Sequence, residues 1–192
     1  YYGTTARDQN YFVEIDDEDY VYAFGTSNGS ITSSAGKYAG PGSGGYIMKM
    51  NSSLSTTQWV STLGNLSPAA FLVDNCDRIY ISGQAAVGAP LNLTSFDTIN
   101  AVNSLGLAGF YLMKLSPDAE DLEFGSFFGN NGSHVDGGTS RFDKRGVVYQ
   151  ATCSNGIFPT TDWAYSDSNL TGAYDNTVFK IDFASNIARA SI

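Results

Sequence analysis

A seven-residue segment that occurs three times constrains this chain more than any other feature. The copies are DDEDYVY at residues 16–22, DNCDRIY at 74–80 and DKRGVVY at 143–149. Each begins with Asp after an apolar residue and ends with Tyr, and a β-branched residue stands just before that Tyr. Such a repeat indicates a chain built from several copies of one structural unit.

A second element follows each copy of the first. It is an apolar run that ends in Lys and one further apolar residue: YIMKM (46–50), YLMKL (111–115) and TVFKI (177–181). The first two are followed, at equal distances, by a large aromatic residue and then by Gly-Asn. The elements keep register over about 60–66 residues, which divides the chain into repeats at approximately 5–65, 66–130 and 131–192.

Each repeat contains four short runs rich in aromatic and β-branched residues, which predict antiparallel strands. The expected strands are 11–15, 21–26, 46–50 and 57–63, then 70–73, 79–83, 110–115 and 122–128, then 139–142, 147–152, 177–181 and 187–192. Residues 100–107 are the best candidate for a short helix. Repeated four-stranded sheets are typical of β-propeller blades, so we predict an all-β chain of about three such blades within a larger propeller.

Three blades are too few to close a ring, because propellers have at least four. Residues 1–4 are similar to the fourth strand of the repeats, so we assign them to the last strand of a preceding blade. We therefore interpret the chain as part of a longer protein, and a ring closed by several chains is the alternative. Either way, the expected partners include further blades of the same or another chain.

The acidic run at residues 16–19 raises the question of a metal site. Only its first residue, Asp16, is shared by all copies, as Asp74 and Asp143. An Asp at the start of a tight turn caps the backbone with its carboxylate, so we predict structural turn residues. A local calcium site is the alternative, but the spacing does not match the Asp-x-Asp-x-Asp-Gly loop, and we expect no cofactor.

The charge balance excludes several classes of partner. The net charge is −9 at pH 7 and the ten basic residues are scattered, which argues against binding to nucleic acid or an anionic membrane. The longest uncharged run, 79–96, is interrupted by Gly, Pro and polar residues, so no membrane insertion is expected. Cys76 and Cys153 fall near opposite ends of equivalent strands, which predicts two thiols rather than a disulfide.

The long connections between the second and third strands of the repeats are rich in Gly, Ser and Asn, and we expect them to be loops on one rim. Aromatic side chains in these loops are candidate contacts for a glycan or a protein, although they could instead pack onto the blades. These candidate binding residues are Tyr38, Phe96, Trp163, Tyr165 and Tyr174.

Residues with catalytic potential are present but weakly arranged. His134 is the only histidine and has Ser133 and Asp136 beside it, yet neighbours in sequence seldom form a spatial triad. The acids in SPDAEDLEF (116–124) belong to a predicted turn, and a glycosidase needs two carboxylates across a cleft. The repeated Lys is expected to pack its stem on a strand and reach a neighbouring acid or water. No catalytic residue is assigned.

The repeated pattern resembles the β-propeller repeat called SBBP. The residues that carry the resemblance are the apolar-Asp-x-x-Asp/Gly-x-Val/Ile-Tyr segment, FPTT at 158–161, the Lys element and the closing Leu/Phe-Gly-Asn. The segments 134–146 and 67–74 are similar to copies in large secreted proteins of Bacteroidetes, often called gliding-motility-associated or PKD-domain proteins. The resemblance covers nearly the whole chain, with Thr152 as a departure where the other copies have Gly.

This resemblance implies an extracellular or cell-surface β-propeller, exported by type IX secretion through a C-terminal sorting domain, and it carries over no catalytic residues. Neither a sorting domain nor a PKD domain is visible in these residues. We therefore expect a non-catalytic scaffold and adhesion module that recognises glycan or protein through rim loops. Part of a secreted polysaccharide hydrolase and a purely structural element of a surface fibre are the alternatives.

Overall fold

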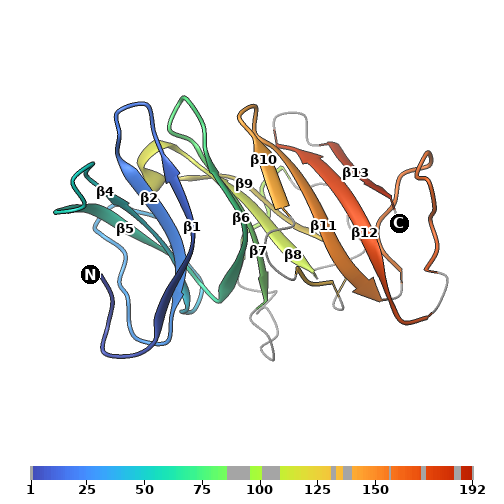
Figure 1. Cartoon of the computed structure of the whole chain (residues 1–192), viewed down its shortest axis with the longest axis horizontal. Coiled ribbons are helices and arrows are strands. Elements are labelled where there is room, and N and C mark those ends of the chain that lie inside the picture. Colours follow the sequence, from blue (N-terminus) through green and yellow to red (C-terminus); the bar gives the residue numbers. More distant parts are fainter. Residues whose placement is uncertain are drawn as a thin grey trace.

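The chain folds into three β-sheets that lie side by side, with the N-terminal and C-terminal ends at opposite ends of the row (Figure 1). This computed structural model describes residues 2–85, 96–100, 109–130, 133–135, 140–155, 157–169, 172–183 and 187–191. Sheet 1 has five strands, and sheets 2 and 3 have four each. The predicted all-β architecture is therefore confirmed.

Each sheet takes its strands from one repeat in sequence order. Sheet 1 contains β1 (Asp8–Ile15), β2 (Val21–Ser27), β4 (Gly45–Met50) and β5 (Thr57–Leu63), with the short β3 (Ala39–Gly40) at its edge. Sheet 2 contains β6 (Leu66–Val73), β7 (Ile79–Ala85), β8 (Phe110–Leu115) and β9 (Leu122–Phe128). Sheet 3 contains β10 (Ser140–Asp143), β11 (Val147–Asn155), β12 (Tyr174–Asp182) and β13 (Ile187–Ser191).

All pairings within these sheets are antiparallel except that of β3, which runs parallel to β5. β3 was not predicted. The strand expected at 70–73 begins earlier, at Leu66, because a bulge between Pro68 and Ala70 breaks the two-residue alternation that marks a strand in the sequence. The expected helix at 100–107 lies outside the described residues except for Asn100.

The alternation of side chains along each strand creates two cores between sheets and a smaller buried cluster on the outer face of sheet 1. The first lies between sheets 1 and 2, and the second lies between sheets 2 and 3. In β2, Tyr22 and Phe24 face the first core, while Ala23 between them faces away from sheet 2. Sheet 2 is therefore covered on both faces, whereas in the described part of the chain sheets 1 and 3 each have one face without a neighbouring sheet.

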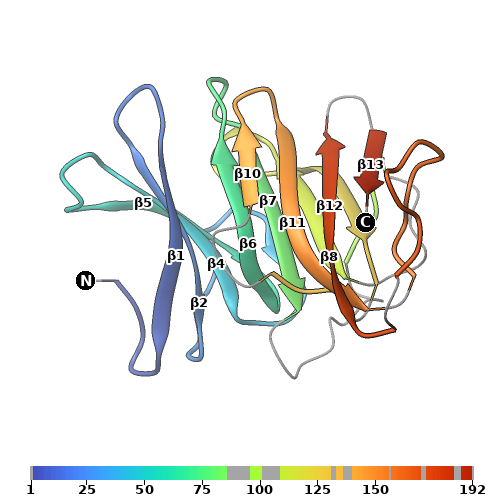
Figure 2. The ribbon, with the colours of Figure 1, turned by 45° about the vertical axis from the view of Figure 1, so that its right-hand side comes forward.

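The first strands of the three sheets lie against each other, β1 against β6 and β6 against β10, as the turned view in Figure 2 allows the reader to follow. Within the described ranges the three sheets do not close into a ring. Residues 2–4 lie outside any strand, and Tyr2 packs against Tyr46 at a ring-centroid distance of 6.0 Å. No helix in the part of the chain described is long and apolar enough to cross a membrane.

Candidate functional site

The three repeated Asp residues cap the turn between the first and second strands of each sheet. Oδ1 of Asp16 accepts hydrogen bonds from the backbone amides two and four residues further on, at 3.0 and 2.8 Å. Oδ1 of Asp74 accepts the same two bonds at 2.8 and 2.9 Å, and Oδ1 of Asp143 accepts the amide two residues on at 2.9 Å. Their common role is to fix the turn.

The second carboxylate oxygen explains why a Tyr stands six residues after the Asp. The Tyr22 hydroxyl donates to Oδ2 of Asp16 at 3.1 Å, and the Tyr80 hydroxyl donates to Oδ2 of Asp74 at 2.9 Å. Burial is the main cause that raises the pKa of both phenols. For Tyr80, the hydrogen bond to Asp74 is the second cause.

The third repeat breaks this pairing. Here the guanidinium of Arg145 binds Oδ2 of Asp143, and Tyr149 is 39% exposed, whereas Tyr22 is fully buried. The Tyr-Asp bond therefore occurs in the two repeats whose Tyr is covered by the next sheet.

Lys49 joins the first turn to sheet 2. Its ammonium lies 3.2 Å from Oδ2 of Asp16 and 3.7 Å from Oδ1 of Asp118, over the rings of Tyr20 and Tyr22 at 4.5 and 4.9 Å. Burial opposes ionisation of Asp16, but the backbone bond from Tyr20 and the Lys49 ammonium outweigh it and lower the pKa of this carboxyl.

The other two repeated lysines also have neighbours on their own sheets. The Lys114 ammonium lies 2.8 Å from Oε2 of Glu123, and the Lys180 ammonium lies 5.3 Å from the centroid of the Tyr149 ring. The repeated Lys therefore packs on its sheet and reaches an acid or an aromatic ring, as the sequence predicts.

Two of the candidate binding residues pack onto the sheets, which is the alternative that the sequence left open for these aromatic side chains. Tyr38 packs against the first core, and burial raises its pKa to about 12. Phe96 is buried, with ring centroids 4.6 Å from Tyr111 and 6.4 Å from Phe127. Both side chains pack there because a large aromatic group gains more from burial than from remaining in water.

A signal for this burial was available in the sequence. Phe96 precedes Lys114 by the same number of residues as Ile31 precedes Lys49. Ile31 packs against Tyr46 and Met48 on the outer face of sheet 1, in the way that Phe96 packs between sheets 1 and 2. An apolar residue repeated in register inside a loop indicates a core position.

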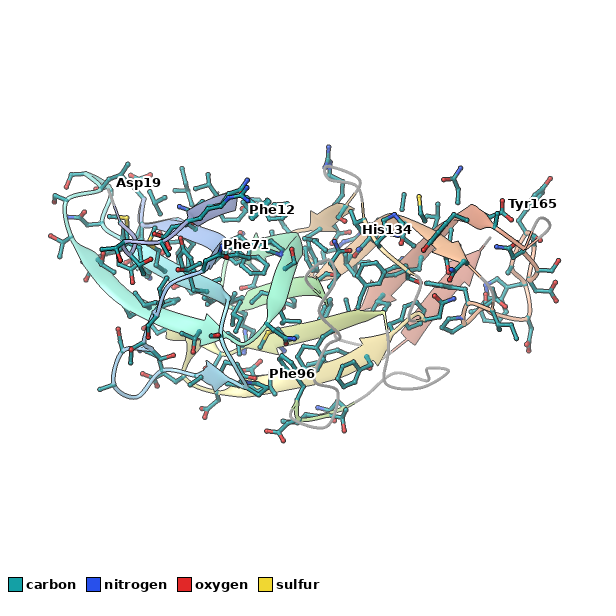
Figure 3. All side chains as sticks on the ribbon, turned by 90° about the horizontal axis from the view of Figure 1, so that it is seen from below. Phe12, Asp19, Phe71, Phe96, His134 and Tyr165 are labelled. Atoms are coloured by element: carbon teal, nitrogen blue, oxygen red, sulfur yellow. The ribbon has the colours of Figure 1, made fainter. Side chains whose placement is uncertain are left out.

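The remaining candidates are exposed and come from one region. Trp163 is 68% exposed and Tyr165 is 97% exposed, both in the loop 157–169. Tyr165 lies at the far end of the molecule from Asp19 (Figure 3). Tyr174 is exposed at the start of β12, so it belongs to a strand rather than a loop, and its ring meets that of His134 edge-on at 5.2 Å.

The base of this loop is held firmly. Nδ2 of Asn130 donates to Oγ of Ser154 at 3.0 Å and to the carbonyls of Asn155 and Ile157 at 2.7 and 2.8 Å. The next residue, Phe158, is buried, within ring contact of Phe128 and Phe179. The exposed aromatics therefore project from a loop whose first residues are anchored to sheets 2 and 3.

The described contacts of Ser133 and of the His134 backbone link this segment to its neighbours. The hydroxyl of Ser133 donates to Oδ1 of Asn130 at 2.9 Å and lies 3.1 Å from Oγ of Ser154. The backbone of His134 pairs with that of Cys153, and Asp136 lies outside the described residues.

Two carboxylates of the turn 116–121 have partners in repeat 1. Oδ1 of Asp118 accepts Nε1–H of Trp59 at 3.1 Å, and Oε1 of Glu120 lies 3.0 Å from the Lys37 ammonium. Across the described ranges, no group of three His, Cys, Asp or Glu side chains could hold a metal ion. Cys76 and Cys153 do not form a disulfide.

Comparison with known proteins adds no assignment. No protein-family model matches the chain, and no curated protein sequence matches it. The resemblance to secreted propeller repeats therefore remains a prediction that rests on the motifs.

Proposed function

We propose that this chain contributes three consecutive blades to a β-propeller of a secreted or cell-surface protein, and that it acts as a non-catalytic binding module for a glycan. The observation that carries the proposal is the loop 157–169, which presents Trp163 and Tyr165 to solvent from an anchored base. Tyr and Trp are enriched at recognition surfaces, because each combines a large apolar face with a polar group.

The arrangement of the sheets supports the propeller. Four antiparallel strands per repeat, first strands that lie against one another, and two large cores that each lie between consecutive sheets are the features of propeller blades. In such an array both faces of each blade are used for packing, so the rim loops remain for recognition. Among the candidate binding residues, Tyr38 and Phe96 already pack onto the sheets.

The chemistry of the loop favours an uncharged sugar polymer. The flat faces of Trp163 and Tyr165 offer apolar surfaces on which the C–H face of a sugar ring can stack, and Asp162 and Asp167 offer acceptors for sugar hydroxyls. A net charge of −9 repels acidic glycans, so a neutral polysaccharide fits best.

A glycan-binding screen with titration calorimetry of each hit tests this proposal. Trp163→Ala and Tyr165→Ala should each weaken binding at least tenfold, because each removes a stacking surface. Tyr11→Ala is the matched control, since Tyr11 is a similarly exposed aromatic on β1, far from the loop. Unchanged affinity in both loop variants, or equal loss in the control, would contradict the proposal.

A further inference from the structure

The outer face of sheet 1 carries apolar side chains at positions that are core in sheet 2. Val13 and Ile15 stand three and one residues before the turn Asp, as Phe71 and Val73 do in the next repeat. Val13 is 63% exposed, whereas Phe71 is 5% exposed and packs in the first core. These positions therefore serve to contact a preceding sheet, and no such sheet lies against sheet 1 among the described residues.

The turn between the third and fourth strands shows the same relation. Leu54 and Ala119 each stand five residues after the repeated Lys and share a left-handed backbone, with φ of 57° and 55°. Ala119 is buried against sheet 1, and its carbonyl accepts the Tyr38 amide at 2.7 Å. Leu54 has a larger apolar side chain and is exposed.

The outer face of sheet 3 also carries apolar positions that are buried in the other two sheets. Val178 is exposed, whereas Ile47 and Leu112, its equivalents two residues before the repeated Lys, are fully buried. Tyr149 beside it is the partly exposed member of the repeated Tyr set. Positions that contact a following sheet in repeats 1 and 2 are thus uncovered in repeat 3.

A specific contact recurs at each junction that the structure contains. The residue three after the turn Asp has a left-handed backbone in every copy: Asp19, Asp77 and Gly146, with φ of 64°, 60° and 76°. Gly146 of sheet 3 lies so close to the Tyr80 ring of sheet 2 that an added Cβ would come within 2.7 Å of it. Asp77 of sheet 2 lies close enough to act electrostatically on Tyr22 of sheet 1.

The same relation between two chains places Asp19 of one chain over Tyr149 of the other, beside the Lys180 ammonium of that other chain. The charges match. The turn that approaches carries Asp17, Glu18 and Asp19. The turn and strand that receive it carry Lys144, Lys180 and Arg145, of which Arg145 already pairs with Asp143. Opposite charges at these two ends favour contact between the sheet 1 end of one copy and the sheet 3 end of another. They disfavour contact between the same ends of two copies.

We propose that a second copy of this chain docks head to tail, with the outer face of its sheet 1 on the outer face of sheet 3. The contact continues the two sheet-to-sheet junctions already inside the chain, with equivalent residues at equivalent positions. Two copies related by a two-fold axis form two such junctions and close a ring of six sheets. The ring closure depends on the propeller interpretation, whereas the contact itself depends only on the repeat.

Sedimentation velocity over a range of concentrations up to about 100 µM tests the proposal, because a reversible dimer appears as a concentration-dependent rise in mass. The unmodified chain should reach twice the mass of one chain. Val13→Asp and Val178→Asp should each weaken association more than tenfold, since each destroys one half of every junction. Both residues are exposed, and circular dichroism with thermal melting confirms that each variant folds.

Mixing the two variants gives the decisive result. The intact sheet 3 face of Val13→Asp should pair with the intact sheet 1 face of Val178→Asp, so the mixture should form a heterodimer although neither variant associates alone. A symmetric contact between like faces predicts instead that one of the two variants remains a dimer, which would overturn the head-to-tail contact. A monomeric unmodified chain at every concentration would overturn the second copy as the occupant.

Tyr165→Asp is the matched control, because Tyr165 is exposed but belongs to the loop 157–169 rather than to either outer face. It should leave association unchanged and abolish glycan binding. Val13→Asp should do the reverse, so failure of this inference and failure of the proposed function give different results.

Discussion

Removing the Asp16 carboxylate should cost far more than removing its counterpart in the third repeat. Asp16 is almost entirely buried, accepts two backbone amides and the Tyr22 hydroxyl, and lies 3.2 Å from the Lys49 ammonium. Breaking a buried ion pair costs about 3–5 kcal/mol. Lys49 retains the exposed Asp118 at 3.7 Å, so we expect Asp16→Ala to lose about 3 kcal/mol, at the lower end of that range.

Two further variants separate the contributions. Asp16→Asn retains Oδ1 as an acceptor for the turn amides and removes the charge, so it should lose about 2 kcal/mol. Asp143→Ala removes the same turn capping where the partner, Arg145, is solvent-exposed, and it should lose about 1 kcal/mol or less.

The assay is urea unfolding at pH 7 followed by fluorescence of Trp59, in a Trp163→Phe background that removes the exposed tryptophan. Equal losses in Asp16→Ala and Asp143→Ala would refute the reasoning, because burial of the ion pair would then contribute nothing. A pH series adds a second check. The folded pKa of Asp16 is lowered, so its stabilisation is present above the unfolded pKa, near 3.8, and is lost as pH falls through the folded value. The gap between Asp16→Asn and the unmodified chain should therefore close in acid.

Three further outcomes follow from single contacts. Phe96→Ala should lose about 3–4 kcal/mol in the same assay, because it leaves a cavity in the first core beside Tyr111. Tyr38 has its pKa raised from 10 to about 12, so its contribution is present below pH 10 and is lost as pH rises towards 12; Tyr38→Phe should flatten the stability curve over that interval. Gly146→Ala should lose about 2–3 kcal/mol from left-handed strain plus contact with Tyr80, whereas Gly172→Ala, with a similar φ and open space around it, should lose about 1 kcal/mol.

The strands were predictable because the sequence reports their pattern twice, once as alternation and once as repetition. The expected strands 57–63, 110–115 and 122–128 match β5, β8 and β9 at both ends. By contrast, β3 consists of Ala39 and Gly40, two small residues that carry no strand signal, and its pairing with β5 depends on where the loop happens to return.

The candidate binding residues were predicted with less success, because exposure is a property of loop conformation. Tyr38 and Trp163 stand in similar Gly-rich and Ser-rich segments, yet one packs in the first core and the other faces solvent. Composition alone cannot separate them. The register of Phe96 with Ile31 shows that repeat position can, since a loop residue that recurs as apolar is under the same packing requirement as a strand residue.

The divergence of the third repeat follows from its place in the row of sheets. In repeats 1 and 2 the Tyr hydroxyl must find a partner because the next sheet buries it, and Asp16 and Asp74 supply that partner. In repeat 3 Tyr149 is 39% exposed, and Asp143 pairs with Arg145 instead. If a second chain does cover this face, Tyr149 loses water and requires an acceptor, and the repeat assigns that role to Asp143, as Asp16 and Asp74 fill it for Tyr22 and Tyr80. A double-mutant cycle between Tyr149→Phe and Asp143→Asn, measured on dimer affinity, should then show coupling, and additive effects would mean that this hydrogen bond does not form when the face is covered.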